Sequence, residues 1–377
     1  MNNSSNKPVL RVAYILAYRS PNYIRTLNIL DALSLIPNIR LYQARNRQKG
    51  IFRYVQTLVR LIWIRIMHNP DIYILGFRGH EIFWLVRVIC FGKALIFDSL
   101  MSPYSALKHE QKLGRIGVLI SKVVFILEKS ILTHSSLVLT DTSNHADFIA
   151  KTFAIEKQKI IALPMAAVES IAPSASSQTL PLAWRTQPNA LRVLFYGSFL
   201  PLHGVDIIMK AIASLDQSQF AFHFVGGDGE RLRTFEASVA NFQLNNVSHE
   251  RWVSFEKLLQ HYIVHADLCL GGPFGNTPQS SRVVTGKSVQ CLALGKATVI
   301  GRIDTQFPFR DRENCLLVEQ GNPESLRQAL QWAAENRAQL DQIGKQGQQL
   351  YSRCFSIASM KEQLQGALYL LMPPPKA

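Results

Sequence analysis

The segment from Val193 to Asp206 reads VLFYGSFLPLHGVD. An apolar, β-branched run ends at Gly197, and a helical pattern begins after Gly204. Glycines at the strand end and at the start of the helix let backbone N–H groups approach an anion, and His203 adds a side chain that can donate to it. A plain strand–turn–helix with a capping histidine also fits these residues. The segment therefore predicts a βα unit whose turn, with Gly197, Ser198 and Gly204, can bind an anion.

The same alternation of strand and helix extends in both directions along the chain. Downstream, strands are predicted at 191–196, 220–225, 247–251, 268–270, 297–300 and 315–318, with helices at 204–215, from 230, 255–263, 287–294 and 323–336. Upstream, strands are predicted at 10–16, 39–42, 72–75, 94–97, 137–140 and 160–163, separated by helical patterns. Strands spaced by whole helices pair in parallel. We expect an α/β protein with two Rossmann-like, doubly wound domains.

The chain of 377 residues is longer than the roughly 250–300 residues that one core organises, which also favours two domains. The predicted domains are 1–170 and 191–355, and a Ser-, Pro- and Ala-rich linker at 171–190 separates them. The segment 356–377 is predicted to form a last helix that packs back across both domains. Ligands of the second domain should lie at the carboxyl ends of its strands.

A second glycine-containing loop, residues 271–287, reads GGPFGNTPQSSRVVTGK and precedes a helical pattern. Arg282 and Lys287 can hold a diphosphate together with the backbone donors and the dipole of a helix N-terminus. The inner residues of the loop suit sugar hydroxyls; they are Phe274, Gly275, Asn276 and Thr277. A solvated surface loop whose cations only keep it soluble is the alternative.

These segments resemble the C-terminal domain of GT-B glycosyltransferases of the retaining family 4 (glycosyl transferases group 1). The resemblance is carried by the following: Phe274-Gly275, Lys287, LALGKATVI at 292–300, and the strand-end turn FVGGDG at 224–229 with Gly227. It covers about residues 190 to 335, and the N-terminal half agrees only in its α/β pattern. It implies two domains facing a cleft, a nucleotide sugar as co-substrate, no other cofactor, and a hexosyltransferase activity of class EC 2.4.

The chain departs from the family pattern at several positions. Arg282 and Gln290 occupy the places of two carboxylates that contact the donor sugar and the ribose in the family, and Ser198 and His203 stand where Arg and Lys are common. Gln290 can still bond ribose hydroxyls, and His203, Arg282 and Lys287 can still neutralise phosphate. The family mechanism needs no covalent nucleophile, so the protein stabilises the charge on the leaving phosphate. His203 and Lys287 are the predicted catalytic cations.

Asp98, at the end of the predicted strand 94–97, is the candidate catalytic residue of the N-terminal domain, and it should face the cleft. A helix-capping or turn role explains it equally well. If the enzyme inverted configuration, Asp98 would be the side-chain base. His80 and Glu81 follow the preceding strand, and a structural role is favoured for both.

Positive charge gathers in the N-terminal half. The net charge is +15, and residues 1–170 hold 22 Lys and Arg against 10 Asp and Glu. Between Asp31 and Asp71 there are seven basic residues and no acidic one. An amphipathic helix over 51–68 would place Arg53, Arg60 and Arg65 at anionic headgroups and Trp63 at the acyl boundary. A helix that simply covers the sheet is the alternative, and without a nucleic-acid-binding motif we expect no nucleic acid partner.

The remaining composition excludes other classes of protein. Five dispersed cysteines without a Cys-x-x-Cys pair argue against a disulfide scaffold, a zinc site or an iron–sulfur cluster, and no carboxylate cluster suggests a metal site. Every long apolar stretch is interrupted by charge or is too short to span a membrane, and no signal peptide is evident. We therefore expect a cytoplasmic, peripheral protein on the inner face of the membrane. The expected acceptor is lipid-linked or a surface polysaccharide; the alternative is a catalytically impaired subunit of an envelope-glycan assembly.

Overall fold

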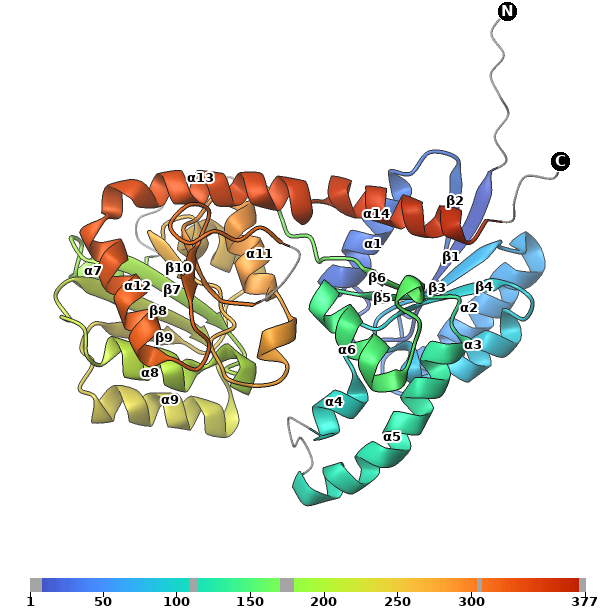
Figure 1. Ribbon diagram of the computed structural model, residues 1–377, viewed down its shortest axis with the longest axis horizontal. Helices are drawn as coiled ribbons and strands as arrows, with labels where there is room; N and C mark the ends of the chain where they lie inside the picture. The colour runs from blue at the N-terminus through green and yellow to red at the C-terminus, as the bar shows by residue number, and fades with distance from the viewer. Residues whose placement is uncertain (1–8, 109–113, 170–179, 304–306, 373–377) are drawn as a thin grey trace, which may run out of the picture. The chain divides into compact units, whose positions relative to one another are not determined.

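The computed structural model describes residues 9–108, 114–169, 180–303 and 307–372 of the chain. Its contacts divide the chain into two compact units. The first comprises the residues up to Met165 together with those from Ile357 onward, and the second comprises Ala166–Ser356 (Figure 1). Each unit is a parallel sheet covered by helices, so the expected pair of Rossmann-like domains is confirmed.

The first unit contains a six-stranded sheet in the order β2-β1-β3-β4-β5-β6, and every pairing is parallel. Its strands are β1 (Leu10–Leu16), β2 (Ile39–Arg45), β3 (Ile72–Leu75), β4 (Ala94–Asp98), β5 (Leu137–Thr140) and β6 (Ile160–Ala162). Its helices are α1 (Ile24–Ser34), α2 (Phe52–His68), η1 (Gly79–Glu81), α3 (Phe83–Ile89), α4 (Pro103–Lys108), α5 (Gly114–His134), α6 (Ser143–Phe153), η2 (Lys157–Lys159) and α14 (Ile357–Leu370).

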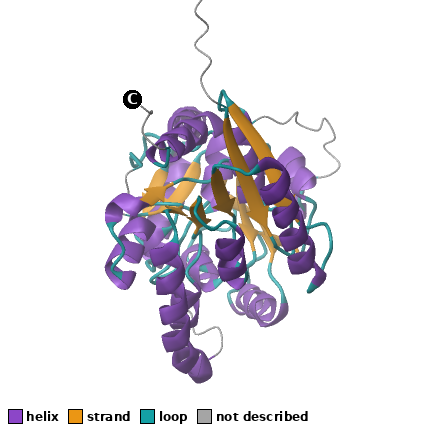
Figure 2. Ribbon diagram, turned by 90° about the vertical axis from the view of Figure 1, so that its right-hand side faces the viewer, coloured by secondary structure: helices purple, strands orange, loops and turns teal. Residues whose placement is uncertain are grey.

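The central strands of this sheet are buried. Helices lie on both sides of the strands (Figure 2). Alternate residues such as Ala13 and Ile15 pack with α2, α3, α5 and α6, whereas α1 packs against α14. Near-continuous apolar strands such as YIL in β1 are typical of a sheet with helices on both sides. The last helix therefore completes the first unit by covering α1.

The second unit contains a six-stranded parallel sheet in the order β12-β11-β10-β7-β8-β9. Its strands are β7 (Leu191–Gly197), β8 (Phe220–Gly226), β9 (Val247–Glu250), β10 (Leu268–Leu270), β11 (Thr298–Gly301) and β12 (Leu316–Val318). Its helices are α7 (Leu182–Thr186), η4 (Pro201–His203), α8 (Val205–Ile212), α9 (Gly229–Asn241), α10 (Phe255–Lys257), η5 (Leu258–Ile263), η6 (Ser280–Arg282), α11 (Gly286–Ala293), α12 (Pro323–Glu335) and α13 (Arg337–Cys354).

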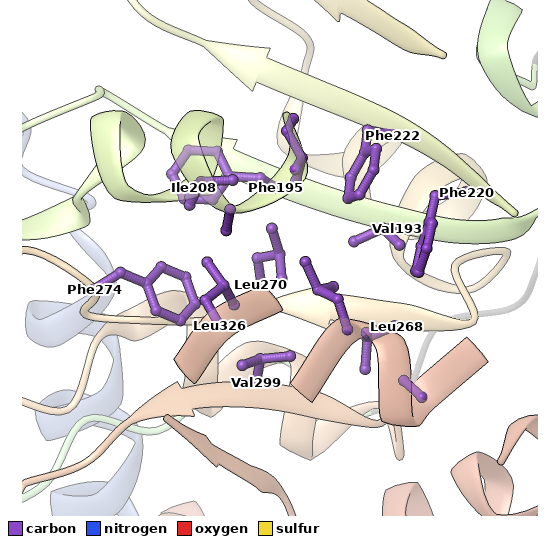
Figure 3. Close-up of a cluster of buried hydrophobic side chains, with 14 of the residues drawn as sticks. Val193, Phe195, Ile208, Phe220, Phe222, Leu268, Leu270, Phe274, Val299 and Leu326 are labelled. Atoms are coloured by element: carbon purple, nitrogen blue, oxygen red, sulfur yellow. The ribbon is translucent and has the colours of Figure 1, made fainter. Parts of the chain in front are cut away.

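The largest core of this unit lies between the sheet and the helices α8 and α12 (Figure 3). Phe195 on β7 and Phe222 on β8 meet Ile208 from α8 and Leu326 from α12, and all four are at most 1% exposed. Phe274, from the loop after β10, belongs to the same core and is 1% exposed. The packing therefore fixes the loops that follow β7 and β10.

Three segments differ from the sequence predictions. The helical pattern after residue 97 is divided into α4 and α5, and residues 109–113 lie outside the described part of the chain. Residues 182–186 of the predicted linker form α7, because Trp184 is buried and donates through Nε1 to the carbonyl of Ala221. The rest of that linker, residues 170–179, is not described. The third difference is α13, a helix that the sequence pattern does not predict.

Candidate functional site

The candidate site lies at the carboxyl ends of β7 and β10. These two strands are neighbours in the sheet, and the chain runs from β7 to β8 on one side and from β10 to β11 on the other. Such a reversal of strand order leaves a crevice in which α/β proteins bind their ligands. Gly197 ends β7, and the loop of residues 271–285 follows β10 and leads into α11.

The turns after β7 and β10 interlock through two glycines. Gly204 has a φ of +63°, and a Cβ added there would lie 2.5 Å from the amide nitrogen of Gly275. A Cβ on Gly275 would lie 2.1 Å from the carbonyl oxygen of Pro201, and the Gly275 amide donates to the carbonyl of Leu202 at 3.1 Å. Only glycine fits both positions. The two predicted loops therefore form one backbone scaffold.

Gly227, after β8, supports the same corner. Its amide donates to the carbonyl oxygen of Gly197 at 3.2 Å, and a Cβ added to it would press into the ring of Phe199. The ends of β7 and β8 thus lie side by side, with main chain rather than side chains at the surface of contact.

Lys287 occupies the first turn of α11 and is 7% exposed. The helix start is fixed by Thr285, whose hydroxyl accepts from the amide of Ser288 at 3.1 Å and donates to the carbonyl of Gly271 at 2.7 Å. Burial lowers the pKa of Lys287 to about 7. In the described chain no carboxylate lies within ion-pair distance of its ammonium, and the ring of Phe195 lies 5.4 Å away.

His203 is neutral at this site. Burial lowers its pKa to about 2, and the charges of Lys287 and Arg231 act in the same direction. The Leu200 amide donates to His203 Nδ1 at 3.3 Å, so the ring proton of the neutral form lies on Nε2. His203 can therefore donate one hydrogen bond through Nε2, but it does not supply the positive charge that the sequence predicts for it.

His203 and Lys287 converge on Gly197. A Cβ built on Gly197 would lie 3.1 Å from Cε1 of His203 and 3.4 Å from Nζ of Lys287. A cation at the N-terminus of a helix is opposed by the helix dipole, and a buried ammonium without a counterion is costly. An anion bound here would offset both costs. The geometry thus favours a phosphate-sized anion beside Gly197.

The other residues predicted in the two loops have separate surroundings. Ser198 and Asn276 are exposed, and Thr277 exchanges hydrogen bonds with Ser280. Arg282 is half-buried, and its Nε donates to the carbonyl of Pro278 at 2.6 Å. Phe274 can contribute only its main chain to a ligand, because its side chain lies in the core. The roles of these residues in substrate binding stay predictions.

Gln290, predicted to bind ribose, is 4% exposed and joins α11 to the segment before the second unit's sheet. Its Nε2 donates to the carbonyl of Val168 at 2.9 Å, and its Oε1 accepts from the Val168 amide at 3.1 Å. This two-way pairing engages the oxygen and one hydrogen of the side-chain amide. A ribose contact would need the second hydrogen of the amide, so that role also stays a prediction.

Asp98 lies at the end of β4, as predicted, but its carboxylate is fully buried in an ion pair. Arg25 Nη2 lies 2.7 Å from Asp98 Oδ1, and both side chains are 0% exposed. Arg25 also donates to the carbonyls of Leu163 and Thr140. This pair holds α1, β4 and β5 together. The structure thus gives Asp98 a structural contact. Asp98 also lines a cavity of the first unit, and its catalytic role stays a prediction.

The four predicted membrane residues lie on α2; Trp63 is exposed as expected, but the three arginines are not directed outward as expected. Arg53 pairs with Glu81, Arg60 donates to the carbonyl of Arg45, and Arg65 donates to the carbonyl of Phe91 at 3.3 Å. Trp63 is 58% exposed. The arginines are thus held against the protein, and the apolar side of the helix faces outward.

Two further helices extend this exposed apolar side. Helix α2 packs on α3, and Trp84 of α3 contacts the ring of His134 of α5 at 5.0 Å. We call the whole surface the apolar helix face; it comprises Phe52, Val55, Val59, Ile62, Trp63, Ile66 and Met67, then Trp84, Leu85, Val88 and Phe91, then Ile116, Val118, Leu119, Ile120, Val123, Ile126 and Leu127. Exposed apolar side chains in such number on neighbouring helices favour an interaction surface.

Sequence reasoning did not single out Arg231 or Arg25. Arg231 stands in the first turn of α9, and its charge reaches His203. The glycine turn at 226–229, between a strand and a helix, is the sequence pattern that could have identified Arg231. No sequence pattern identifies Arg25, because a single arginine in a helical segment does not indicate that its side chain is fully buried.

Over the part of the chain that the structure describes, no group of three or more His, Cys, Asp or Glu side chains could hold a metal ion. None of the described helices is both long enough and apolar enough to cross a bilayer.

Comparison with known proteins agrees with this geometry. Residues 190–336 match the model of the family described as glycosyl transferases group 1. No curated protein sequence matches the chain. Among solved structures, Anabaena HepE in complex with UDP-glucose is similar, with a TM-score of 0.70, 12% identity, and coverage of 96% of this chain and 100% of that chain.

Two other structures are similar over nearly the whole chain. Sucrose-phosphate synthase from Thermosynechococcus elongatus has a TM-score of 0.69 and 17% identity, and the match covers 96% of this chain and 98% of that one. The lipopolysaccharide outer core galactosyltransferase WaaB, in its apo form, has a TM-score of 0.62 and 12% identity, with coverage of 96% and 100%. At these identities the likeness shows the fold. Residues 190–336 thus form a domain of the glycosyl transferases group 1 type in a chain with the GT-B fold.

Proposed function

We propose that the protein transfers a sugar from a nucleotide-sugar donor to a lipid-linked or surface-polysaccharide acceptor, with retention of anomeric configuration, while bound to the inner face of the membrane. The observation that carries the donor assignment is the buried Lys287 ammonium beside Gly197, which lacks a counterion in the described chain. A diphosphate supplies the missing negative charge. HepE was solved with UDP-glucose, which supports a nucleotide sugar as the donor.

In this proposal the site acts on the leaving group. As the bond between the sugar C1 and the phosphate oxygen breaks, negative charge grows on the diphosphate, and Lys287 and the Nε2–H of His203 stabilise it. The acceptor oxygen forms the new bond to C1, and its proton passes to the departing phosphate oxygen. The rigid glycine scaffold holds these donors in place before the reaction, so little reorganisation is needed.

Two observations support an acceptor at the membrane. The apolar helix face is exposed on the first unit, and Arg40, Arg47 and Lys49 are exposed in the segment between Asp31 and Asp71, which contains no acidic residue. Apolar side chains that enter the acyl boundary and cations that attract anionic headgroups act together in peripheral binding. The likeness to WaaB, described as a lipopolysaccharide outer core galactosyltransferase, favours the same acceptor class.

The replacement of Lys287 by methionine tests the donor site. Methionine keeps the aliphatic stem but removes the charge, so UDP affinity and sugar-nucleotide turnover should fall about tenfold or more, since a charge-assisted hydrogen bond contributes about 1.5–3 kcal/mol. The thermal midpoint should be unchanged or higher, because a desolvated ammonium is removed. Turnover is measured as nucleotide release from UDP-, GDP- and ADP-sugars in the presence of native membranes.

Lys210→Met is the matched control, since Lys210 is exposed on α8 of the same unit. It should leave turnover unchanged. Equal turnover in wild type and Lys287→Met would refute the proposed donor site.

A catalytically impaired subunit is the second candidate. It is favoured by Arg282 and Gln290 at the positions of the family carboxylates, and by the engagement of the Gln290 amide with Val168. Nucleotide binding that depends on Lys287, without nucleotide release from any sugar nucleotide, would select this candidate.

A further inference from the structure

A cavity of about 430 Å³ lies within the first unit, at the carboxyl ends of β3 and β4. One wall is α5, which contributes Val124, Leu127, Glu128 and Ile131, and the opposite side includes His80 and the residues that lead into α4. Four positions spaced by three and four residues form one face of a helix. The volume is within the range of small-molecule sites.

Glu128 is the unusual residue of this cavity. It is 1% exposed, its Oε2 accepts from the Tyr104 amide at 2.9 Å, and its Oε1 is buried without a hydrogen-bond partner. Within the described residues no cation forms an ion pair with it. Burial raises its pKa to about 7, although hydrogen bonds from the Tyr104 amide and the Ser102 side chain act in the opposite direction.

His80 presents a second polar atom without a partner. Its Nε2 is buried and makes no hydrogen bond, and its ring packs edge-on against Phe97 at 4.8 Å. Burial lowers the pKa of His80 to about 4, so the ring is neutral at pH 7. Buried polar atoms almost always have partners, so two orphaned ones lining one cavity indicate a ligand that satisfies them.

The cavity is continuous with the apolar helix face. Leu127 lines the cavity and is also 52% exposed on the outer side of α5, next to Ile126 and one turn from Val123. An apolar ligand can therefore pass from the surface that we propose to contact the membrane into the cavity without crossing a polar barrier of α5.

We propose that this cavity binds a membrane-derived lipid that bears a hydroxyl group, with the apolar chain against α5 and the hydroxyl donating to Glu128. His80 Nε2 forms a second hydrogen bond with the polar end of the lipid, as donor or as acceptor according to its tautomer. Calling this lipid the acceptor rests on the proposed function. The binding itself does not, because it needs neither a donor nucleotide nor turnover.

The test compares two small probes of similar shape. Octan-1-ol can donate a hydrogen bond and 1-methoxyoctane can only accept one. Titration calorimetry with the full chain at pH 8, without nucleotide, should show wild type binding the alcohol about tenfold more tightly, because the carboxylate accepts only from a donor. Equal affinities for the two probes would overturn the assignment of Glu128.

Glu128→Gln sharpens the comparison. The glutamine Oε1 can keep the Tyr104 hydrogen bond, and its NH₂ group can donate equally to the alcohol and to the ether. The preference should disappear while the thermal midpoint stays close to wild type. Glu81→Gln is the matched control, since Glu81 also lines the cavity but pairs with Arg53 and Arg78, and it should keep the preference. A preference that survives in Glu128→Gln contradicts the inference.

A second variant locates the probes in case Glu128→Gln does not fold. Val124→Trp fills the cavity from the partly buried face of α5 and should abolish binding of both probes. Wild-type affinity in Val124→Trp would place the ligand elsewhere and overturn the proposal. Loss of turnover with alcohol binding intact would instead count against the proposed function alone.

Discussion

Lys287 links the chemistry of the candidate site to pH. Its pKa in the free protein is lowered to about 7 by burial, and a bound phosphate favours the protonated form and raises that pKa. The affinity for UDP should therefore be greatest near pH 7 and fall toward pH 9, by up to about tenfold per pH unit. His203, with a pKa of about 2, does not titrate in this range.

Calorimetric titration of UDP between pH 7 and 9 measures this dependence. Lys287→Met removes the titrating group, so its weaker affinity should be flat over the same range. A wild-type affinity that does not change with pH would show that another group binds the phosphates.

The Arg25–Asp98 pair allows a second test at a single residue. Asp98→Asn leaves the Arg25 guanidinium buried without its anion, so the free energy of unfolding should fall by about 3–5 kcal/mol. The double change of Arg25 to Met and Asp98 to Leu should recover much of that loss, as measured by urea unfolding. If Asp98→Asn instead kept wild-type stability and lost only activity, Asp98 would be catalytic as the sequence suggested.

The sequence predicted the position of the donor loops, but it did not predict the burial and charge of the individual residues in them. Gly197, His203 and Lys287 were identified because glycines and cations at the ends of strands have a recognisable pattern, and the structure brings all three together. Burial was not visible in the sequence. It makes His203 neutral, places Phe274 in the core and hides Glu128, an acid that stands in an otherwise ordinary apolar helix.

At the level of elements, α13 shows how composition can hide a helix. Gly344 and Gly347 lie within it and lower its helical propensity, yet the packing against α11 requires them. A Cβ on Gly344 would lie 2.1 Å from the carbonyl oxygen of Gly295, and one on Gly347 would lie 2.7 Å from Leu292. Close helix packing therefore overrides local propensity here.

Alanine at two helical glycines should have opposite effects. Gly344→Ala forces α13 away from the Gly295 carbonyl and should cost about 1–3 kcal/mol of unfolding free energy. Gly366→Ala in α14 meets no atom within 4 Å and should gain about 0.5–1 kcal/mol, because alanine favours the helix. Urea denaturation measures both, and destabilisation by Gly366→Ala would contradict the packing described for α14.

The amphipathic pattern of α2 was correct, but the direction of its polar side was wrong. Periodicity shows which residues share a side of a helix, and it does not show which side meets the sheet when both sides contain apolar residues. The three arginines donate to acceptors within the protein. Arg53 pairs with Glu81, and Arg60 and Arg65 donate to the carbonyls of Arg45 and Phe91. This arrangement leaves the side with Val59, Trp63 and Ile66 exposed.

At the scale of the whole molecule, the apolar helix face makes a testable prediction about membranes. Val59, Trp63 and Ile66 changed together to Ser should abolish co-flotation with anionic vesicles, since each large apolar side chain contributes about 1.5–3 kcal/mol on burial. The triple change spares the arginine contacts, so the fold should persist.

Trp252→Ser combined with Phe255→Ser is the control, because both residues are exposed apolar side chains of the second unit. This variant should float as wild type does. Flotation of the Val59, Trp63 and Ile66 variant at the wild-type level would exclude the apolar helix face as the contact.

The two-domain architecture followed from the sequence because alternating strands and helices admit few arrangements. Crossovers between parallel strands have one hand, and each sheet then needs a single point at which the order reverses. The strand order of both sheets agrees with this rule. The sequence did not predict where the last helix packs. Helix α14 belongs to the first unit although it is the last element of the chain, and distance along the sequence carries no information on such contacts.

The position of α14 also bears on how the protein is made. Helix α1 buries Ile29 and Leu33, and its neighbour α14 contributes Met360 and Leu364, which a ribosome polymerises more than 300 codons later. Synthesis runs at about 5–20 residues per second, so a nascent chain keeps this side of α1 uncovered for tens of seconds. During translation the second unit can close before the first is complete, and the uncovered helix is a natural target for chaperones.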